Sequence, residues 1–289
     1  MTRGELVERL IELLLEDMPE YRAQAVAFSR ADAAARRRLL RGLMNVRAPG
    51  RALPDEYWRL QDELLAAERA ERGVVDVWAL PAVPADPRLV VWQGDITRLA
   101  ADAIVNAANS ALLGCFVPCH GCIDNAIHSA AGLQLRDECA AVMRDRRGGE
   151  PTGRAEITRG YNLPARQVIH TVGPIVTGAA PTARDRADLA ACYRSCLELA
   201  DARALRSVAL CCISTGEFRF PGPEAAQIAV REVRAFLDGR AGSTSVERVV
   251  FDVFSERDLA LYTTCLASTG REGVPACGAD RVRARGPMR

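Results

Sequence analysis

The spacing of hydrophobic and polar residues changes near residue 74 and divides the chain into two parts. Before that point apolar residues recur at helical spacing, as at Leu6, Leu10 and Leu13. This part of the chain shows no cluster of residues suited to catalysis. We therefore expect residues 1–73 to form a helical N-terminal extension that packs on the rest of the protein, and a partner-binding arm is the alternative.

After residue 74, short apolar runs rich in β-formers alternate with helical stretches. Strands that alternate with helices predict an α/β fold, in which helices cover both faces of the sheet. Residues 268–289 show no periodicity, and we expect a disordered tail there. The expected strands cover residues 89–92, 104–105, 155–158, 168–172, 208–213 and 249–254, and the expected helices cover residues 124–146, 184–203, 224–237 and 256–267.

The amino-acid composition is that of an ordinary globular protein, and it excludes some classes of function. Of the 289 residues 26% are charged, and a net charge of +1 gives no reason to expect nucleic acid as a partner. The chain has no lysine, which excludes a P-loop and Schiff-base chemistry. No apolar run is long enough to span a membrane, and the N-terminus does not resemble a secretory signal, so we expect a cytoplasmic protein.

The densest chemistry lies in residues 106–132, directly after a short apolar run that predicts a buried strand. Ligands of open α/β sheets bind beyond the carboxyl ends of the strands, so this position indicates a site. Cys115, His120 and Cys122 are spaced closely enough to share one ion. Two thiolates and one imidazole would hold Zn²⁺ and leave one position for water or substrate.

Three other interpretations of these residues remain open. Cys119 lies in the same loop, and its coordination would close the site into a structural zinc centre. The cysteines could instead be reduced structural thiols, because cysteine is often simply a small buried hydrophobe. One of them could also be a nucleophile.

Two more loops follow expected strands and carry polar residues. Asp95, in the first, could accept hydrogen bonds from an amine, although a turn or cap role is the commoner one for an aspartate there. Residues 213–221, in the second, include a glycine turn whose backbone N–H groups could bind an anion. Asp124 is either part of the site or a helix N-cap, and His128 and His170 are expected to be core histidines.

Four ordered motifs resemble the macrodomain family: GDIT at 94–97, IVNAAN at 104–109, CIDNAIHSAAG at 122–132 and ISTGEFRFP at 213–221. The Cys115, His120 and Cys122 insertion, together with a helical N-terminal extension, resembles its zinc-dependent branch. The resemblance covers residues 74–267 and implies a three-layer α/β/α fold with a mixed central sheet.

The resemblance also implies an ADP-ribose site across the strand ends. Asp95 would bind the adenine amine with help from the Ile96 backbone, and Asn109 would hold the distal ribose. Arg219 stands where a second glycine is frequent in the family, which leaves the course of that loop open. The walls of the diphosphate and ribose site would be Ile123, Asp124 and Asn125 on one side and Ser214, Thr215, Gly216, Glu217 and Phe218 on the other.

The activity that the resemblance implies is zinc-dependent removal of mono-ADP-ribose from modified protein side chains, with Asp or Glu as the expected linkage. Asn109 and Asp124 are the expected catalytic residues, and Asp124 is the candidate general base. Members of this branch are often linked with a sirtuin-type transferase and a lipoyl-carrier protein, which is a possible substrate. Two alternatives are a non-catalytic ADP-ribose reader with a structural zinc and an O-acetyl-ADP-ribose deacetylase.

Overall fold

Six strands form a mixed central sheet in the computed structural model, which describes residues 1–28 and 32–267. All neighbouring strands are parallel except the last pair, β6 and β5. Two short strands, β1 (Val75–Asp76) and β3 (Leu99–Ala100), pair separately. In spatial order the sheet contains β2 (Leu89–Gln93), β8 (Arg248–Val253), β7 (Ser207–Leu210), β4 (Ala103–Ala108), β6 (Gln167–Val172) and β5 (Ala155–Arg159).

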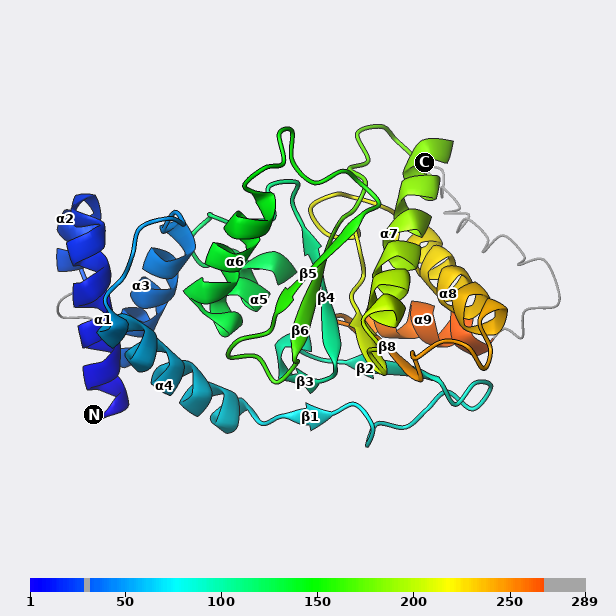
Figure 1. Ribbon diagram of the computed structural model, residues 1–289, viewed down its shortest axis with the longest axis horizontal. Helices are drawn as coiled ribbons and strands as arrows, with labels where there is room; N and C mark the ends of the chain where they lie inside the picture. The colour runs from blue at the N-terminus through cyan, green and yellow to red at the C-terminus, as the bar shows by residue number, and fades with distance from the viewer. Residues whose placement is uncertain (29–31, 268–289) are drawn as a thin grey trace, which may run out of the picture.

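Helices cover both faces of this sheet (Figure 1). On one face lie α5 (Ile123–Ala131) and α6 (Leu133–Met143), and on the other α7 (Ala183–Ala202), α8 (Gly222–Gly239) and α9 (Glu256–Ala267). The central strands are buried on both faces, which is why they read as continuous apolar runs rather than as alternating ones. The predicted three-layer α/β/α fold with a mixed sheet is confirmed.

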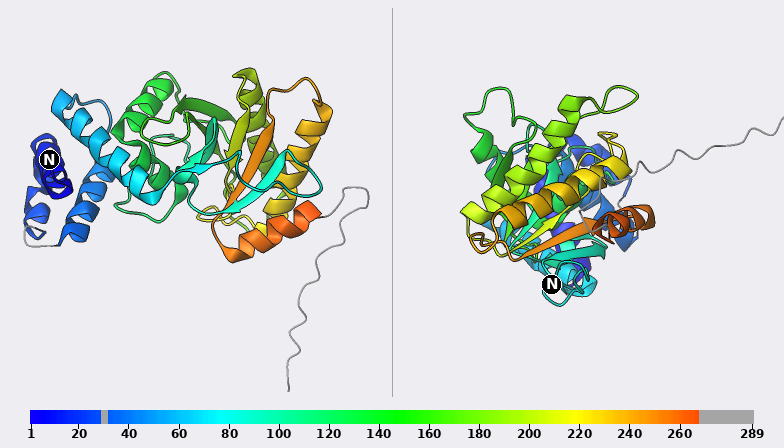
Figure 2. Two further views of the ribbon diagram at one scale, coloured as in Figure 1. Left: turned by 90° about the horizontal axis from the view of Figure 1, so that it is seen from below. Right: turned by 90° about the vertical axis from the view of Figure 1, so that its right-hand side faces the viewer.

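The N-terminal helices gather at the end of the molecule opposite α8 and α9 (Figures 1 and 2). Their apolar faces form a second hydrophobic core, which Leu133 of α6 joins to the sheet domain. A division of the chain at residue 73 stays a prediction, and the predicted tail lies outside the described residues. These helices are α1 (Arg3–Asp17), η1 (Pro19–Tyr21), α2 (Arg22–Val26), α3 (Ala33–Val46) and α4 (Asp55–Arg72).

The single helix predicted over residues 124–146 is wrong, because Gly132 separates α5 from α6. Its φ of 96° lies in the region that favours glycine. A Cβ atom there would also lie 2.6 Å from the side chain of Gln61, which accepts a hydrogen bond from the Leu133 amide at 2.9 Å. The break therefore allows α4 to dock directly against α6.

The strand predicted over residues 208–213 is too long, since β7 ends at Leu210. The Ile213 amide donates to the Cys211 carbonyl at 2.9 Å, so the backbone turns there instead of continuing along the sheet. The turn directs the following residues, including Ser214, toward the ends of the neighbouring strands.

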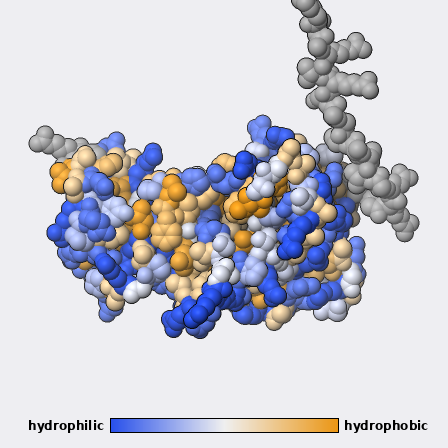
Figure 3. Space-filling model, turned by 90° about the horizontal axis from the view of Figure 1, so that it is seen from above, coloured by the Kyte–Doolittle hydropathy of each residue, from blue (hydrophilic) through white to orange (hydrophobic). Residues whose placement is uncertain are grey.

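The surface seen from above is largely hydrophilic, with smaller apolar patches between (Figure 3). Among the described residues, no helix combines the length and the apolar composition that crossing a bilayer requires.

Candidate active site

A cavity of about 610 Å³ lies at the carboxyl ends of the parallel strands. It has the size and position expected of a ligand site in an open α/β sheet. Of the predicted site residues, only Asn125 is missing from its lining. Those that line it are Asp95, Ile96, Asn109, Cys115, His120, Cys122, Ile123, Asp124, Ser214, Thr215, Gly216, Glu217 and Phe218.

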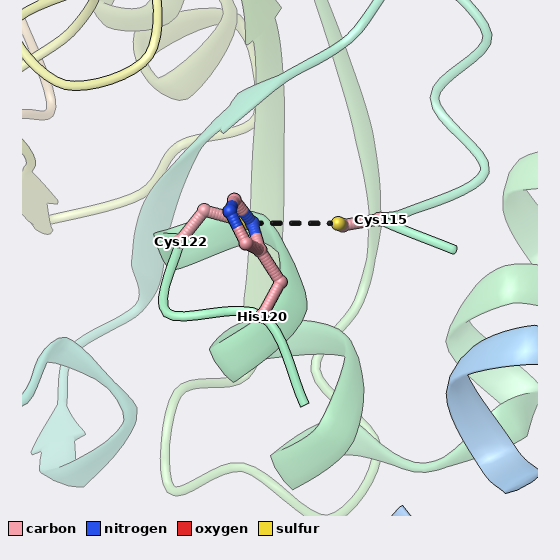
Figure 4. Close-up of side chains that lie close together, drawn as sticks. All are labelled: Cys115, His120 and Cys122. Carbon is pink, nitrogen blue, oxygen red and sulfur yellow. Dashed lines mark hydrogen bonds between the residues drawn. The ribbon is translucent and has the colours of Figure 1, made fainter. Parts of the chain in front are cut away.

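The predicted metal ligands come together beside this cavity. The ligand atoms of Cys115, His120 and Cys122 all lie within 4.8 Å of one another, and the side chains are half-buried. Figure 4 shows Cys115 and His120 pointing toward each other, with Cys115 Sγ 3.6 Å from His120 Nδ1. Two ligand atoms of a tetrahedral zinc lie about 3.5 Å apart, so the separation of Cys115 and His120 matches that of two ligands of one ion.

Cys122 also begins a helix. Its Sγ accepts a hydrogen bond from the Asn125 amide at 3.4 Å, as the N-cap of α5. Burial raises the pKa of the Cys122 thiol to about 11 in the metal-free protein. Zinc coordination would therefore have to displace the proton of this thiol.

Cys119 points away from the other two loop cysteines. Its Sγ donates to the Arg38 carbonyl at 3.3 Å, and its backbone amide donates to Asn45 Oδ1 at 2.9 Å. Its φ of 54° turns the loop back on itself at this residue. Within the described residues, the protein therefore brings three clustered ligands to this point of the cavity and leaves Cys119 against α3.

The Asp124 carboxylate is 4% exposed and lies between two asparagines. Asn106 Nδ2 donates to Oδ1 at 2.8 Å, and Asn109 Nδ2 donates to Oδ2 at 3.3 Å. Burial raises the pKa of Asp124 to about 6, against the opposing effect of the Asn106 hydrogen bond. Two donors and a raised pKa make this carboxyl a well-oriented proton acceptor at neutral pH.

Asn109 lies at the cavity, but its side chain makes contacts within its own loop. Its Nδ2 group also donates to the Gly114 carbonyl at 3.1 Å, and its Oδ1 accepts from the Ala111 amide at 3.0 Å. Asn109 therefore shapes residues 109–114 and orients Asp124 in addition to lining the pocket.

Backbone N–H groups face the cavity from two sides. The Ile123 and Asp124 amides, in the first turn of α5, have no acceptor among the described residues, and they lie where a helix dipole favours an anion. Across from them, the amides of residues 216–218 have no acceptor among the described residues. Ser214 and Arg219 frame that loop with φ values of 65° and 58°, so Arg219 adopts a conformation that glycine often supplies.

The other end of the cavity holds Asp95. Its Oδ1 accepts hydrogen bonds from the Thr97 amide at 3.0 Å and the Thr97 hydroxyl at 2.7 Å, which makes it the N-cap of η2 (Ile96–Arg98). Arg72, the last residue of α4, lies 3.4 Å from Asp95 Oδ2. Asp95 is thus a cap residue and a cavity residue at once.

Sequence reasoning missed three residues at this end of the cavity: Asp252, Phe254 and Asp258. Asp252 is buried at the end of β8, where burial and the nearby Asp95 raise its pKa well above the usual value. Phe254 follows the same strand and is 84% exposed, although it borders the cavity. The sequence does carry a signal for two of them, because a polar and an aromatic residue stand at the end of an apolar strand, where ligands of α/β sheets bind.

Asn125 is directed away from the cavity. Its Nδ2 donates to the Val117 carbonyl at 3.0 Å, and its Oδ1 accepts from Arg41 of α3. The structure thus brings its side chain against residues 115–122 rather than to the predicted wall. We call residues 115–122 the metal-binding loop after the ligands predicted in it.

A second group of potential ligands lies deeper in the protein. The ligand atoms of His128, Cys139 and His170 also lie within 4.8 Å of one another, and all three side chains are buried. His170 is hydrogen-bonded to Asn106 at 3.2 Å and to Thr158 at 2.9 Å, in agreement with its predicted role in the core. His128 is buried without a hydrogen-bond partner among the described residues.

Comparison with known proteins identifies the fold family. The family model described as "Macro domain" matches residues 105–229. A protein-ADP-ribose hydrolase of Treponema medium is 46% identical over 269 residues, which cover 92% of this chain and 100% of that protein. The chain belongs to the macrodomain family. A protein-ADP-ribose hydrolase of Staphylococcus aureus (strain MSSA476) is 50% identical over 224 residues, which cover 78% of this macrodomain chain and 82% of that protein.

Solved macrodomain structures agree with this assignment. The Trypanosoma brucei macrodomain in complex with ADP-ribose superposes with a TM-score of 0.61 at 34% identity, covering 75% of this chain and 92% of that one. The Oceanobacillus iheyensis macrodomain with ADP has a TM-score of 0.54 at 40% identity, covering 61% of this chain and 88% of that one.

Proposed function

We propose that this macrodomain hydrolyses the bond between ADP-ribose and a modified protein side chain, using zinc. The observation that carries the proposal is the position of the buried Asp124 carboxylate, which lines the same cavity as the Cys115, His120 and Cys122 cluster. The names of the similar Treponema medium and Staphylococcus aureus proteins, both protein-ADP-ribose hydrolases, support it.

ADP-ribose would lie along the cavity with its adenine near Asp95 and Ile96. The carboxylate suits the exocyclic amine of adenine, which is a donor. The diphosphate would lie between the first-turn amides of α5 and the amides of residues 216–218, because both groups of N–H donors favour an anion. The distal ribose would then reach the end of the cavity that holds Asn109 and the metal-binding loop.

Cys115, His120 and Cys122 would hold Zn²⁺, as their spacing and donor types suit that ion. Zinc bound there would act as a Lewis acid toward the distal ribose or the scissile linkage. If zinc binds His120 Nδ1, the other ring nitrogen faces Glu217, whose Oε1 lies 3.6 Å from Nε2. A carboxylate on the second nitrogen would fix the ring orientation.

Asp124 would accept a proton from the attacking water, while Asn106 and Asn109 hold its two oxygens. An ADP-ribosyl ester of Asp or Glu is the proposed linkage, since its cleavage requires only an activated water. Among proteins, a lipoyl-carrier protein modified by a sirtuin-type transferase is the substrate we propose to try first.

The test is a hydrolysis assay on mono-ADP-ribosylated proteins with Asp/Glu, Ser and Arg linkages, run with and without a zinc chelator. We expect release of ADP-ribose from the acidic linkage only, and loss of that release on chelation. Tight ADP-ribose binding without turnover on any linkage would show a reader instead. Turnover of O-acetyl-ADP-ribose alone would show a deacetylase.

A further inference from the structure

We infer that α3 of the N-terminal helical extension positions the metal-binding loop, and that Arg41 and Asn45 are the residues through which it does so. The inference rests on the proposed zinc site and adds to it a role for the extension. Both residues contact the loop without lining the cavity, so neither needs to contact substrate or metal.

Arg41 contacts the loop directly and through Asn125. Its Nε and a terminal nitrogen donate to Asn125 Oδ1 at 3.2 and 2.7 Å, and the same terminal nitrogen lies 3.4 Å from the His120 carbonyl. With its oxygen held in this way, Asn125 directs Nδ2 toward the carbonyls of Val117, at 3.0 Å, and Cys115, at 3.5 Å. One guanidinium therefore fixes the backbone at both ends of the loop.

Asn45 holds the centre of the loop. It is 1% exposed, and its Oδ1 accepts a hydrogen bond from the Cys119 amide at 2.9 Å. Its Nδ2 donates to Ser129 Oγ at 3.1 Å, and that hydroxyl donates to Asn125 Oδ1 at 3.3 Å. The left-handed conformation of Cys119 is thus held by a buried side chain of α3 rather than by a glycine.

The end of α3 is itself fixed relative to Leu113, which precedes the loop, and Phe116, which lies within it. Arg136 of α6 donates to the Met44, Asn45 and Arg47 carbonyls at 2.9, 2.9 and 2.7 Å. The same guanidinium donates to the Leu113 carbonyl at 2.7 Å and lies 4.4 Å from the ring centre of Phe116. A buried cation on the terminal carbonyls of a helix is a favourable arrangement, so α3 has a fixed position relative to the loop.

The consequence is a preorganised metal site. A free loop would lose backbone entropy when it binds an ion, whereas a loop that α3 already orders loses less. Groups that orient metal ligands without touching the metal typically change metal affinity by about 10- to 100-fold.

The experiment measures zinc affinity by competition with a chromogenic chelator in the full-length chain and in Arg41→Ala, Arg41→Lys and Asn45→Ala. The matched control is Arg37→Ala, because Arg37 lies one turn earlier on α3 and pairs with Glu68 at 2.6 and 2.8 Å. We expect affinity about 10- to 100-fold weaker in both alanine variants, partial recovery in Arg41→Lys, and no change in the control.

A second readout follows amide hydrogen exchange of residues 115–122 in metal-free protein. Exchange there should speed up in Arg41→Ala and Asn45→Ala, while the strands of the sheet keep their protection. The inference is overturned if wild type binds zinc and both alanine variants match it in zinc affinity and in amide exchange of the loop. That outcome would leave the proposed function standing. A wild-type protein that binds no zinc would overturn the proposed metal site, and the inference with it.

Discussion

Two clusters of cysteine and histidine lie close together in this macrodomain, and they differ in burial and in their access to the cavity. Cys115, His120 and Cys122 are half-buried and border the cavity, whereas His128, Cys139 and His170 are buried behind it. The potential ligand atoms lie within the same 4.8 Å limit in both groups. Proximity and residue type alone therefore do not distinguish the proposed zinc site from the inner cluster.

Hydrogen bonding and access separate the two clusters. Asn106 Nδ2 donates to Asp124, so it presents its other hydrogen to His170 Nδ1, which must accept it. The proton of His170 then lies on Nε2, toward the Thr158 hydroxyl, and neither nitrogen offers a free lone pair. In the loop cluster the one such hydrogen bond with a group outside the cluster, among the described residues, is a long one, from the Asn125 amide to Cys122 Sγ at 3.4 Å, and the three side chains line the cavity. We regard the inner cluster as part of the core that supports Asp124.

The largest expected effect comes from Cys122→Ser. Serine keeps an acceptor for the Asn125 amide and so preserves the helix cap, but it removes a thiolate ligand. Loss of the proposed zinc should remove about 4 kcal/mol of transition-state stabilisation, which is about a thousandfold in kcat. Steady-state kinetics check this, with the thermal unfolding midpoint of metal-free protein as the control. Wild-type turnover in the variant would show that the cluster has no catalytic role.

Asp124→Asn should lower kcat by about a hundredfold, because the amide cannot accept the proton of the attacking water. The near-identical shape fits the buried position, but the new NH2 group cannot accept from Asn106 or Asn109, so the thermal unfolding midpoint of the variant is the control. ADP-ribose affinity, measured by calorimetry, should change little. A variant that binds ADP-ribose and turns over normally would remove Asp124 from the mechanism.

The inner cluster should affect how the free energy of unfolding depends on pH, and we expect no effect of it on zinc binding. Burial lowers the pKa of His170 to about 4, so as the pH falls below about 6.5 the unfolded chain takes up this proton before the folded one. The contribution of His170 to stability is complete above pH 6.5 and is lost toward pH 4. Between pH 7 and 5 the loss is about 2 kcal/mol.

Urea unfolding of metal-free wild type and His170→Gln at pH 7 and 5 isolates this effect. The comparison is needed because the raised pKa of Asp124 acts in the opposite direction in both proteins. The free energy of unfolding of the variant should fall by about 2 kcal/mol less than that of wild type over this range. Equal falls in the two proteins would contradict the assignment of a neutral buried histidine.

The smallest effect is expected from Glu217→Gln. Glu217 lies 3.6 Å from His120 Nε2, but its side chain is 73% exposed, so solvent weakens the pairing. Zinc affinity should fall by only about two- to fivefold, less than for a buried partner of a metal ligand. A drop as large as that for Cys122→Ser would mean that Glu217 coordinates the ion itself.

The sequence predicts those parts of the site whose residues are close in the chain. Cys115, His120 and Cys122 lie within one loop, and Asp124 follows them directly, so spacing alone groups them. The sheet and its flanking helices could also be predicted, because buried parallel strands appear in the sequence as continuous apolar runs. The break at Gly132 was missed, since helical periodicity continues across it.

The contacts between the extension and the cavity could not be predicted. Arg41 and Asn45 lie about 80 residues before the groups that they bind. From the sequence alone, an arginine on a helix is expected to be solvated. Arg72 and Asp95 pair across the same boundary. Only the folded chain shows that the extension reaches both ends of the cavity.

The central claim concerns which cluster holds the ion, and zinc content per chain tests it most directly. Wild type, Cys122→Ser and Cys139→Ala would be dialysed against zinc, freed of excess ion and analysed for metal. We predict one zinc per chain in wild type and in Cys139→Ala, and none in Cys122→Ser. Zinc retained by Cys122→Ser and lost from Cys139→Ala, or no zinc in wild type, would contradict the account.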